Sequence, residues 1–181
     1  LTCHANKARP AATIEWFKNG YQVTDNIVYS TELIPGDKRE NAKSVLSIRG
    51  DLRNEQQGAE YFCRANHRAL SSPSQTMVTL NILYPPNIPI ITGYNPVNAV
   101  QANDTVRMVC ESVGGNPTPQ VVWFKNNQKL DFTFSIGHGK STNELTFTAL
   151  PVDDGSIYRC EASNQATPLP LTTQVTLKVH F

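Results

Sequence analysis

The chain has 181 residues and is nearly neutral, with 16 Lys and Arg residues against 15 Asp and Glu residues. This balance gives no support to binding of nucleic acid or of an anionic membrane, which needs a basic excess gathered on one face. The sequence has no signal peptide and no apolar run of 18 or more residues, so we expect this stretch to carry neither an export signal nor a membrane anchor. The length suits two modules of about 90 residues each.

The first half of the chain predicts short β-strands, because apolar residues alternate with polar ones between turn residues. In the stretch 12–18, alternation places Ile14 and Trp16 inside, and an Asn-Gly hairpin turn follows at 19–20. The expected strands are 1–3, 12–18, 21–23, 31–34, 44–48, 59–66 and 76–83. The last of these should bury Val78, Leu80 and Ile82.

The second half repeats this plan, with strands expected at 105–111, 120–125, 144–148, 155–162 and 173–179. A turn at Asn126-Asn127 follows the second of these strands. The separation from Trp16 to Tyr61 is longer than that from Trp123 to Tyr158. We therefore expect the first half to hold two extra strands in this interval and the second half only one.

Two adjacent prolines, Pro85 and Pro86, mark the junction between the halves. Proline restricts φ and favours an extended backbone, and no Gly/Ser spacer is present. We therefore place the domains at 1–84 and 85–181 and expect a stiff, elongated arrangement. A freely hinged boundary is the alternative.

A four-residue echo links the halves, because Trp-Phe-Lys-Asn at 16–19 returns at 123–126. Each copy follows a cysteine at the same spacing, and each half closes with Tyr-x-Cys. The repeated residues are Cys3, Trp16, Tyr61 and Cys63, then Cys110, Trp123, Tyr158 and Cys160. Cys…Trp…Tyr-x-Cys is the signature of an immunoglobulin domain, in which the cysteines bridge two sheets and the Trp packs on the bridge. The sequence predicts an all-β fold of two tandem immunoglobulin-like β-sandwiches, intermediate-set and then constant-type-two or short intermediate-set.

The signature implies bridges from Cys3 to Cys63 and from Cys110 to Cys160, which leave no thiol for catalysis or metal binding. Each bridge should stabilise its domain by roughly 4 kcal/mol on the chain-entropy argument. Such bridges persist in oxidising compartments and indicate an extracellular protein. The alternative is a cytosolic domain in which the cysteines only pack together.

Two further observations concern the prediction of an extracellular fragment. Asn103, in the sequence Asn-Asp-Thr, is the only acceptor for N-glycosylation, because a proline excludes the one at Asn116. Cys3 lies almost at the start of the chain, whereas an immunoglobulin domain needs a strand A before this cysteine. We therefore expect strand A to be missing from the fragment.

The stretch Arg-Pro-Ala-Ala at 9–12, with Thr-Glu-Leu at 31–33, Lys-Arg-Glu at 38–40 and Tyr-Pro-Pro at 84–86, resembles the second domain of the nephrin/Kirrel (irregular-chiasm) adhesion receptors. The second half matches only at the generic immunoglobulin level. The resemblance implies the ectodomain of a type I membrane protein that recognises other immunoglobulin-superfamily receptors between cells. In that family the binding surface usually lies on the outermost domain, so this fragment either spaces that domain or forms part of the contact surface. The alternative is the ligand-binding ectodomain of a growth-factor-type receptor.

Phe17, Phe62 and Arg64 should project together from the outer side of one sheet, because their neighbours in the sequence point inward. Two aromatic rings beside an Arg have the composition of a protein-interface hot spot. The alternative is local packing of Phe17 under its hairpin.

Arg49-Gly50-Asp51 is the tripeptide that integrins read, although its residues can equally be solvated loop residues. His67, with Arg64 and Arg68, forms a basic corner that we interpret as a solvated loop rather than an anion site.

None of the histidines has the spacing of metal ligands, and no Ser/His/Asp set can be placed. We predict no catalytic residues, no metal, no cofactor and no enzymatic activity.

Overall fold

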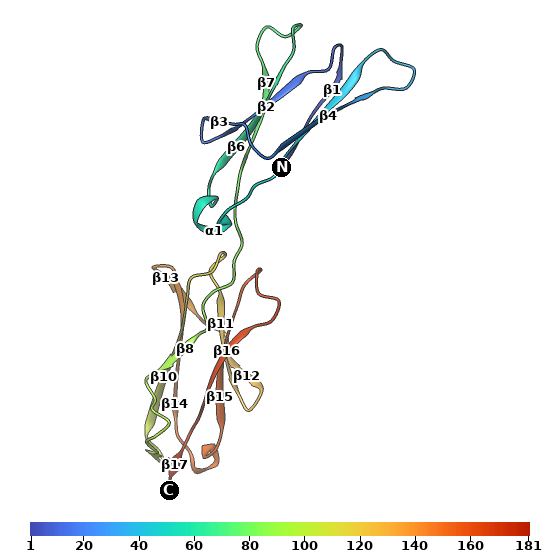
Figure 1. Cartoon of the computed structure of the whole chain (residues 1–181). Helices are drawn as coiled ribbons and strands as arrows, with labels where there is room; N and C mark the ends of the chain where they lie inside the picture. Colours follow the sequence, from blue (N-terminus) through green and yellow to red (C-terminus); the bar gives the residue numbers. More distant parts are fainter. The chain divides into compact units, whose positions relative to one another are not determined.

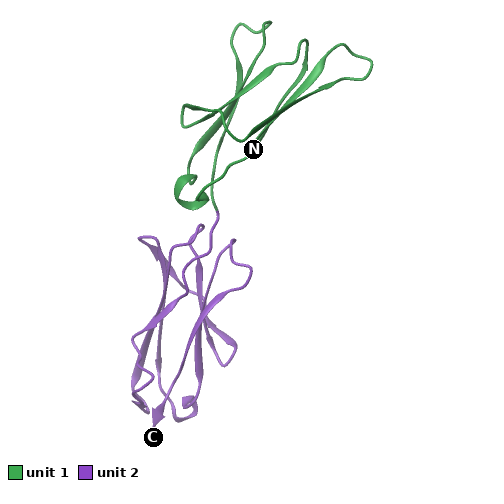
Figure 2. Cartoon of the chain, viewed as in Figure 1, with its two compact units in different colours: residues 1–82 green, residues 83–181 purple.

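The computed structural model describes residues 1–181 and divides into two compact units, residues 1–82 and 83–181 (Figures 1 and 2). The division falls before Tyr84 because this residue is held by the second unit. Tyr84 forms an isolated antiparallel bridge with Asn116. Its carbonyl oxygen also accepts a hydrogen bond from the side-chain amide of Asn164 at 2.8 Å. The prolines of the junction therefore belong to the second unit.

The first unit consists of two antiparallel sheets and one short helix, α1 (Leu52–Glu55) (Figure 1). The three-stranded sheet has the order β1-β5-β4, with β1 (Thr2–Ala8), β5 (Glu40–Leu46) and β4 (Ile27–Leu33). The four-stranded sheet has the order β3-β2-β6-β7, with β3 (Tyr21–Val23), β2 (Thr13–Lys18), β6 (Glu60–Asn66) and β7 (Ser74–Thr79). The outward face of this second sheet carries the candidate site.

The second unit has two four-stranded sheets and a two-stranded parallel pair. The first sheet is β13 (Ser135–Gly137), β14 (Lys140–Thr148), β10 (Thr105–Val113) and β8 (Ile90–Thr92). The second is β12 (Gln128–Asp131), β11 (Gln120–Lys125), β15 (Ile157–Ser163) and β16 (Leu171–Thr176). The parallel pair is β17 (Val179–His180) and β9 (Val100–Gln101), and a 3-10 turn, η1, covers Pro151–Asp153.

Each unit buries its own core between its sheets. Alternation along each strand sends every second side chain inward. Trp16 and Cys63, which are paired across β2 and β6, both lie on the inward face. The core of the first unit is Cys3, Trp16, Leu46, Ala59, Tyr61 and Cys63. The core of the second unit is larger: Val106, Met108, Cys110, Val121, Trp123, Leu145, Ala149, Tyr158, Cys160, Ala162, Leu177 and Val179. The prediction of an all-β fold made of two β-sandwiches is confirmed.

The hairpin after each tryptophan-bearing strand uses two residues with positive φ. Asn19 and Gly20 have φ values of 48° and 85°, and Asn126 and Asn127 have 47° and 69°. Asn and Gly tolerate this left-handed region best, and two-residue hairpins of this kind match the twist of the strands. The Asn-Gly and Asn-Asn signals in the sequence therefore correspond to real turns.

Several expected strand boundaries and side-chain directions were wrong. Strand β1 does not end at Cys3 but continues to Ala8, through a register shift that includes Lys7 at φ 60°. Val78 was expected inside, yet 44% of its surface is exposed. In the second unit β8 lies beside β16, where Thr173 donates to the carbonyl of Pro89 at 2.5 Å. Within residues 1–82 no strand lies beside β7 in the corresponding position.

The expected difference between the halves was also wrong. The second unit holds both extra strands, because β12 pairs with β11 and β13 pairs with β14. The shorter interval in its sequence is accommodated mainly by β13, which has three residues where β4 of the first unit has seven. The division into intermediate-set and constant-type-two sets therefore stays a prediction.

Candidate protein-contact surface

The disulfide-linked centre of each unit fixes the sheet that presents the candidate surface. Cys3 is bonded to Cys63 and Cys110 to Cys160, with Cα–Cα distances of 6.4 Å in both. The two buried indoles are satisfied differently. The Nε1–H of Trp16 donates to the hydroxyl of Ser44 at 2.9 Å, whereas that of Trp123 donates to the main-chain carbonyl of Asn143 at 3.1 Å.

The two corner tyrosines are also anchored differently. The hydroxyl of Tyr61 donates a hydrogen bond to the side-chain oxygen of buried Gln56 at 2.7 Å, and burial raises the pKa of this hydroxyl. The ring of Tyr158 stacks on Phe147, with centroids 4.9 Å apart, and burial raises the pKa of its hydroxyl as well. Lys125 lies over the Tyr158 ring at 5.8 Å. Tyr61 thus holds β6, and Tyr158 holds β15, against the core of its unit.

The outward face of β2, β6 and β7 carries a stacked aromatic pair. Phe17 and Phe62 are direct cross-strand partners, and their rings are parallel within 5° with centroids 4.6 Å apart. The Arg64 guanidinium lies over the Phe17 ring at 4.5 Å. Met77, opposite Phe62 on β7, is 61% exposed and extends the apolar row to the sheet edge. We call Phe17, Phe62, Arg64 and Met77 the aromatic face.

Arg64 forms no ion pair within the chain. Its cross-strand neighbour Glu15 accepts hydrogen bonds from the side-chain amides of Asn66 at 2.8 Å and Gln22 at 3.4 Å instead. The cation is therefore held by stacking on two rings and remains available to an anionic group on a partner.

On the corresponding face of the second unit, the arginine is paired within the chain. Phe124 takes the place of Phe17, and the Arg159 guanidinium lies over its ring at 4.9 Å. Arg159 also donates to Asn127 at 2.7 Å and forms an ion pair with Glu161 at 2.8 Å. Only the first unit thus combines two stacked rings with an arginine that forms no ion pair.

The Arg49-Gly50-Asp51 tripeptide lies at the start of α1. The Asp51 carboxylate caps this helix by accepting the backbone N–H groups of Arg53 and Asn54, each at 3.1 Å. Its other oxygen accepts from the Asn54 side chain at 2.6 Å. The bonds from the Asn54 backbone and side chain lower the pKa of this carboxyl. Both oxygens are therefore engaged in local hydrogen bonds, and the carboxylate has a structural use as the helix cap.

Asn103 lies at an exposed turn before β10, with φ 73°. Its backbone N–H donates to the carbonyl of Ala149 at 2.8 Å, while its side-chain amide makes no hydrogen bond. The amide that would carry a glycan is thus accessible.

The chain contains no group of His, Cys, Asp and Glu side chains arranged to hold a metal ion. No helix in the structure is both long and apolar enough to cross a bilayer.

Comparison with protein families gives two matches, both described as an immunoglobulin domain, at residues 1–76 and 88–164. Nephrin of Rattus norvegicus is 26% identical over the whole chain, which spans 14% of nephrin. Cell adhesion molecule 2 of Rattus norvegicus is 33% identical over 91% of the chain, which spans 36% of that protein. Kin of IRRE-like protein 3 of Homo sapiens is 31% identical over 91% of the chain, which spans 19% of it. The chain thus corresponds to about a third or less of each relative.

Two solved structures resemble the chain at low sequence identity. The crystal structure of Rst D1-D2 aligns with a TM-score of 0.65 at 16% identity, covering 99% of this chain and 92% of that one. Titin domains I67-I69 align with the same TM-score at 22% identity, covering 98% and 58%. At these identities the likeness shows the fold alone.

Proposed function

Because this chain belongs to the immunoglobulin superfamily and groups with its adhesion receptors, we propose that it is part of a receptor ectodomain that recognises proteins on neighbouring cells. Its two disulfides agree with an extracellular location. Its relatives form a non-enzymatic family, and none of them favours a growth-factor-type receptor. Attachment to the cell as a type I membrane protein is part of the proposal.

The aromatic face is the surface that we assign to protein contact. Aromatic and Arg side chains dominate the binding energy of interfaces, because they bury a large area with few rotatable bonds. Here Phe17 and Phe62 are already stacked, and Arg64 is already placed over them, so little ordering is needed on binding. Other immunoglobulin-superfamily receptors are the partners that we propose. The single observation that carries this assignment is Arg64, without an ion-pair partner, on the aromatic pair.

The test is a cell-aggregation assay with the whole receptor and with an Arg64→Glu variant. Charge reversal on the stack should weaken aggregation at least about tenfold at equal surface expression, because an interface arginine typically contributes a few kcal/mol. Lys43→Glu makes the same charge change on the opposite sheet of the same unit and should leave aggregation intact.

Equal effects of Arg64→Glu and Lys43→Glu would contradict the assignment of the aromatic face. The alternative, in which the fragment only spaces an outer binding domain, has a different signature. Binding should then survive Arg64→Glu and also survive removal of the first unit, residues 1–82. Loss of binding on that removal, at constant expression, excludes the spacer.

A further inference from the structure

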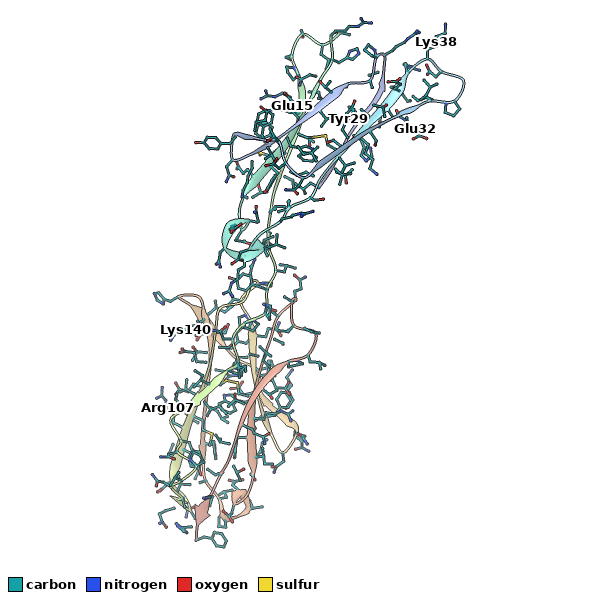
Figure 3. All side chains as sticks on the ribbon, viewed as in Figure 1. Glu15, Tyr29, Glu32, Lys38, Arg107 and Lys140 are labelled. Atoms are coloured by element: carbon teal, nitrogen blue, oxygen red, sulfur yellow. A yellow bond between two sulfur atoms is a disulfide. The ribbon has the colours of Figure 1, made fainter.

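Three loops of the first unit gather at the end of the sandwich opposite α1 (Figure 1). They are the β1–β2, β4–β5 and β6–β7 loops, and Lys38 lies on the second of them (Figure 3). Between them is a cavity of about 710 Å³ lined by Arg9, Pro10, Leu33, Asp37, Lys38, Glu40 and Arg68. A second cavity of about 400 Å³ shares Pro10 and Arg68 with the first and continues it along the β6–β7 loop. We call the two cavities together the loop groove.

The loop groove and the residues beside it carry a local excess of positive charge. Arg9, Lys38 and Arg68 line the loop groove, together with the acidic Asp37 and Glu40. Lys7 and Arg39 lie close to these residues in the sequence and bring the local excess to three. The whole chain has a net charge of +1, so the remainder is net negative. The charge is therefore concentrated, although the composition is balanced.

The two acidic residues of the loop groove are already engaged. Asp37 forms an ion pair with Arg39 at 2.6 Å. One oxygen of Glu40 accepts the backbone N–H of Ala11 at 3.1 Å. Arg9, Lys38 and Arg68 have no carboxylate partner within the chain. Three cations without an ion-pair partner, from three separate loops, thus line one cavity, where they can bind an external anion together.

The composition of the loop groove favours a sulfated polysaccharide over an acidic protein. A protein interface of any strength has an aromatic or aliphatic centre. The lining of the loop groove contains no Phe, Tyr or Trp and only one leucine in each cavity, Leu33 in the first and Leu70 in the second. Closely spaced sulfates and carboxylates on a stiff chain need only separated cations and an open path. Guanidinium groups, moreover, bind such oxyanions through two parallel hydrogen bonds.

We propose that the loop groove binds a sulfated glycosaminoglycan chain, with Arg9 and Arg68 pairing with sulfates on opposite sides of the cavity and Lys38 with a third anionic group. Such a chain is present on cell surfaces and in the surrounding matrix, where this protein is located. The site is distinct from the aromatic face, so a receptor could hold matrix and a protein partner through different surfaces. The sequence alone suggested only a solvated corner at Arg68, because Arg9 and Lys38 lie far from it along the chain.

The test is binding of the two-unit chain, residues 1–181, to an immobilised heparin oligosaccharide across a series of NaCl concentrations. A variant carrying Arg9→Ser, Lys38→Ser and Arg68→Ser should bind at least about tenfold more weakly. Its affinity should also fall less steeply with salt, because fewer counterions are released. All three side chains are exposed and lack partners, so the thermal unfolding of the variant should match that of the wild type.

The matched control carries Arg49→Ser, Lys129→Ser and Lys178→Ser, which removes the same charge outside the loop groove and should retain heparin binding within about twofold. The proposal is overturned if the wild type does not bind heparin in 50 mM NaCl, or if both triple variants lose binding equally. It is also overturned if poly-glutamate binds as tightly as heparin of equal charge, because the site would then recognise acidic polypeptides. Since Arg64 remains intact in the groove variant, cell aggregation tests the proposed protein contact separately.

Discussion

At the scale of single residues, the two units solve the same problem with different chemistry. A buried indole N–H without an acceptor costs free energy, and Trp16 meets this need with one side-chain hydroxyl, that of Ser44. Trp123 instead uses a main-chain carbonyl, which no substitution removes. The first unit is therefore sensitive at a position where the second is protected.

Ser44→Ala should lower the free energy of unfolding of the first unit by about 1–3 kcal/mol, because it leaves the Trp16 N–H buried and unpaired. Urea unfolding followed by tryptophan fluorescence measures this change. Ser47→Ala, at an exposed position after the same strand, should alter stability by less than about 0.5 kcal/mol. Equal stability of Ser44→Ala and the wild type would contradict the assigned role of the hydroxyl.

The Lys125–Asp153 ion pair makes the stability of the second unit depend on pH. Burial alone would raise the pKa of Asp153, but the hydrogen bonds from Lys125 and from the Leu150 N–H outweigh it and leave the pKa lowered. A lowered folded-state pKa means that the stabilisation is present above the unfolded pKa, about 3.9, and is lost as the pH falls through the folded value. The pKa of Lys125 is raised by the same bond, so its contribution persists at neutral pH.

We therefore expect the second unit to lose stability between about pH 5 and the folded-state pKa of Asp153. Asp153→Asn should be less stable than the wild type at pH 7 by about 1–3 kcal/mol, and the difference should shrink on acidification. Urea unfolding at a series of pH values, followed by Trp123 fluorescence, measures both effects. Parallel stability curves for the two proteins would show that Asp153 does not titrate with folding.

At the scale of elements, α1 shows how a sequence motif can have a structural use. The Asp51 carboxylate closes the first turn of α1 by accepting two backbone N–H groups. A helix of four residues gives no apolar periodicity, so the sequence alone predicts only a loop at this place.

Asp51→Ala should destabilise the first unit by about 1 kcal/mol through loss of the cap. It should leave attachment of integrin-bearing cells to the immobilised chain unchanged, because the carboxylate is already engaged. A cell-attachment assay in the presence and absence of a soluble Arg-Gly-Asp peptide gives the second readout. Inhibition of attachment by the peptide would show that the tripeptide is accessible after all.

The elements marked by the signature residues could be predicted from the sequence. Side-chain exposure and pairing that depend on contacts between distant segments could not. The hairpins at Asn19 and Asn126 and the inward tryptophans follow from local patterns. The exposure of Val78 depends instead on which strand covers β7, and alternation alone carries no such information. The stacking of Phe17 on Phe62 was anticipated from strand direction. That Arg64 lacks a carboxylate partner could be known only from the contacts of Glu15.

At the scale of the whole molecule, two separate cores each depend on one disulfide and contain one tryptophan. The chain contains two tryptophans in all, so each indole reports on its own unit. The smaller core of the first unit has fewer buried side chains to compensate for loss of its bridge.

Replacing Cys3 and Cys63 by Ala should destabilise the first unit by roughly 4 kcal/mol, as expected for a loop of this length. Replacing Cys110 and Cys160 should have a similar effect on the second unit. Denaturant unfolding of variants that retain only Trp16 or only Trp123 assigns each loss to its unit. If removing one disulfide lowered the free energy of unfolding of both units by a similar amount, the two cores would not be separate.

The parallel pairing of β9 with β17 has a mechanical consequence. Val100 donates its N–H to the carbonyl of Lys178 at 3.0 Å, and Ala102 donates to that of His180 at 2.8 Å. When the two ends of the second unit are pulled apart, these parallel strands slide past each other along their length. Both hydrogen bonds then resist the force together instead of opening one after the other. The resistance of the second unit to tension between its two ends should therefore depend on the pairing of β9 with β17.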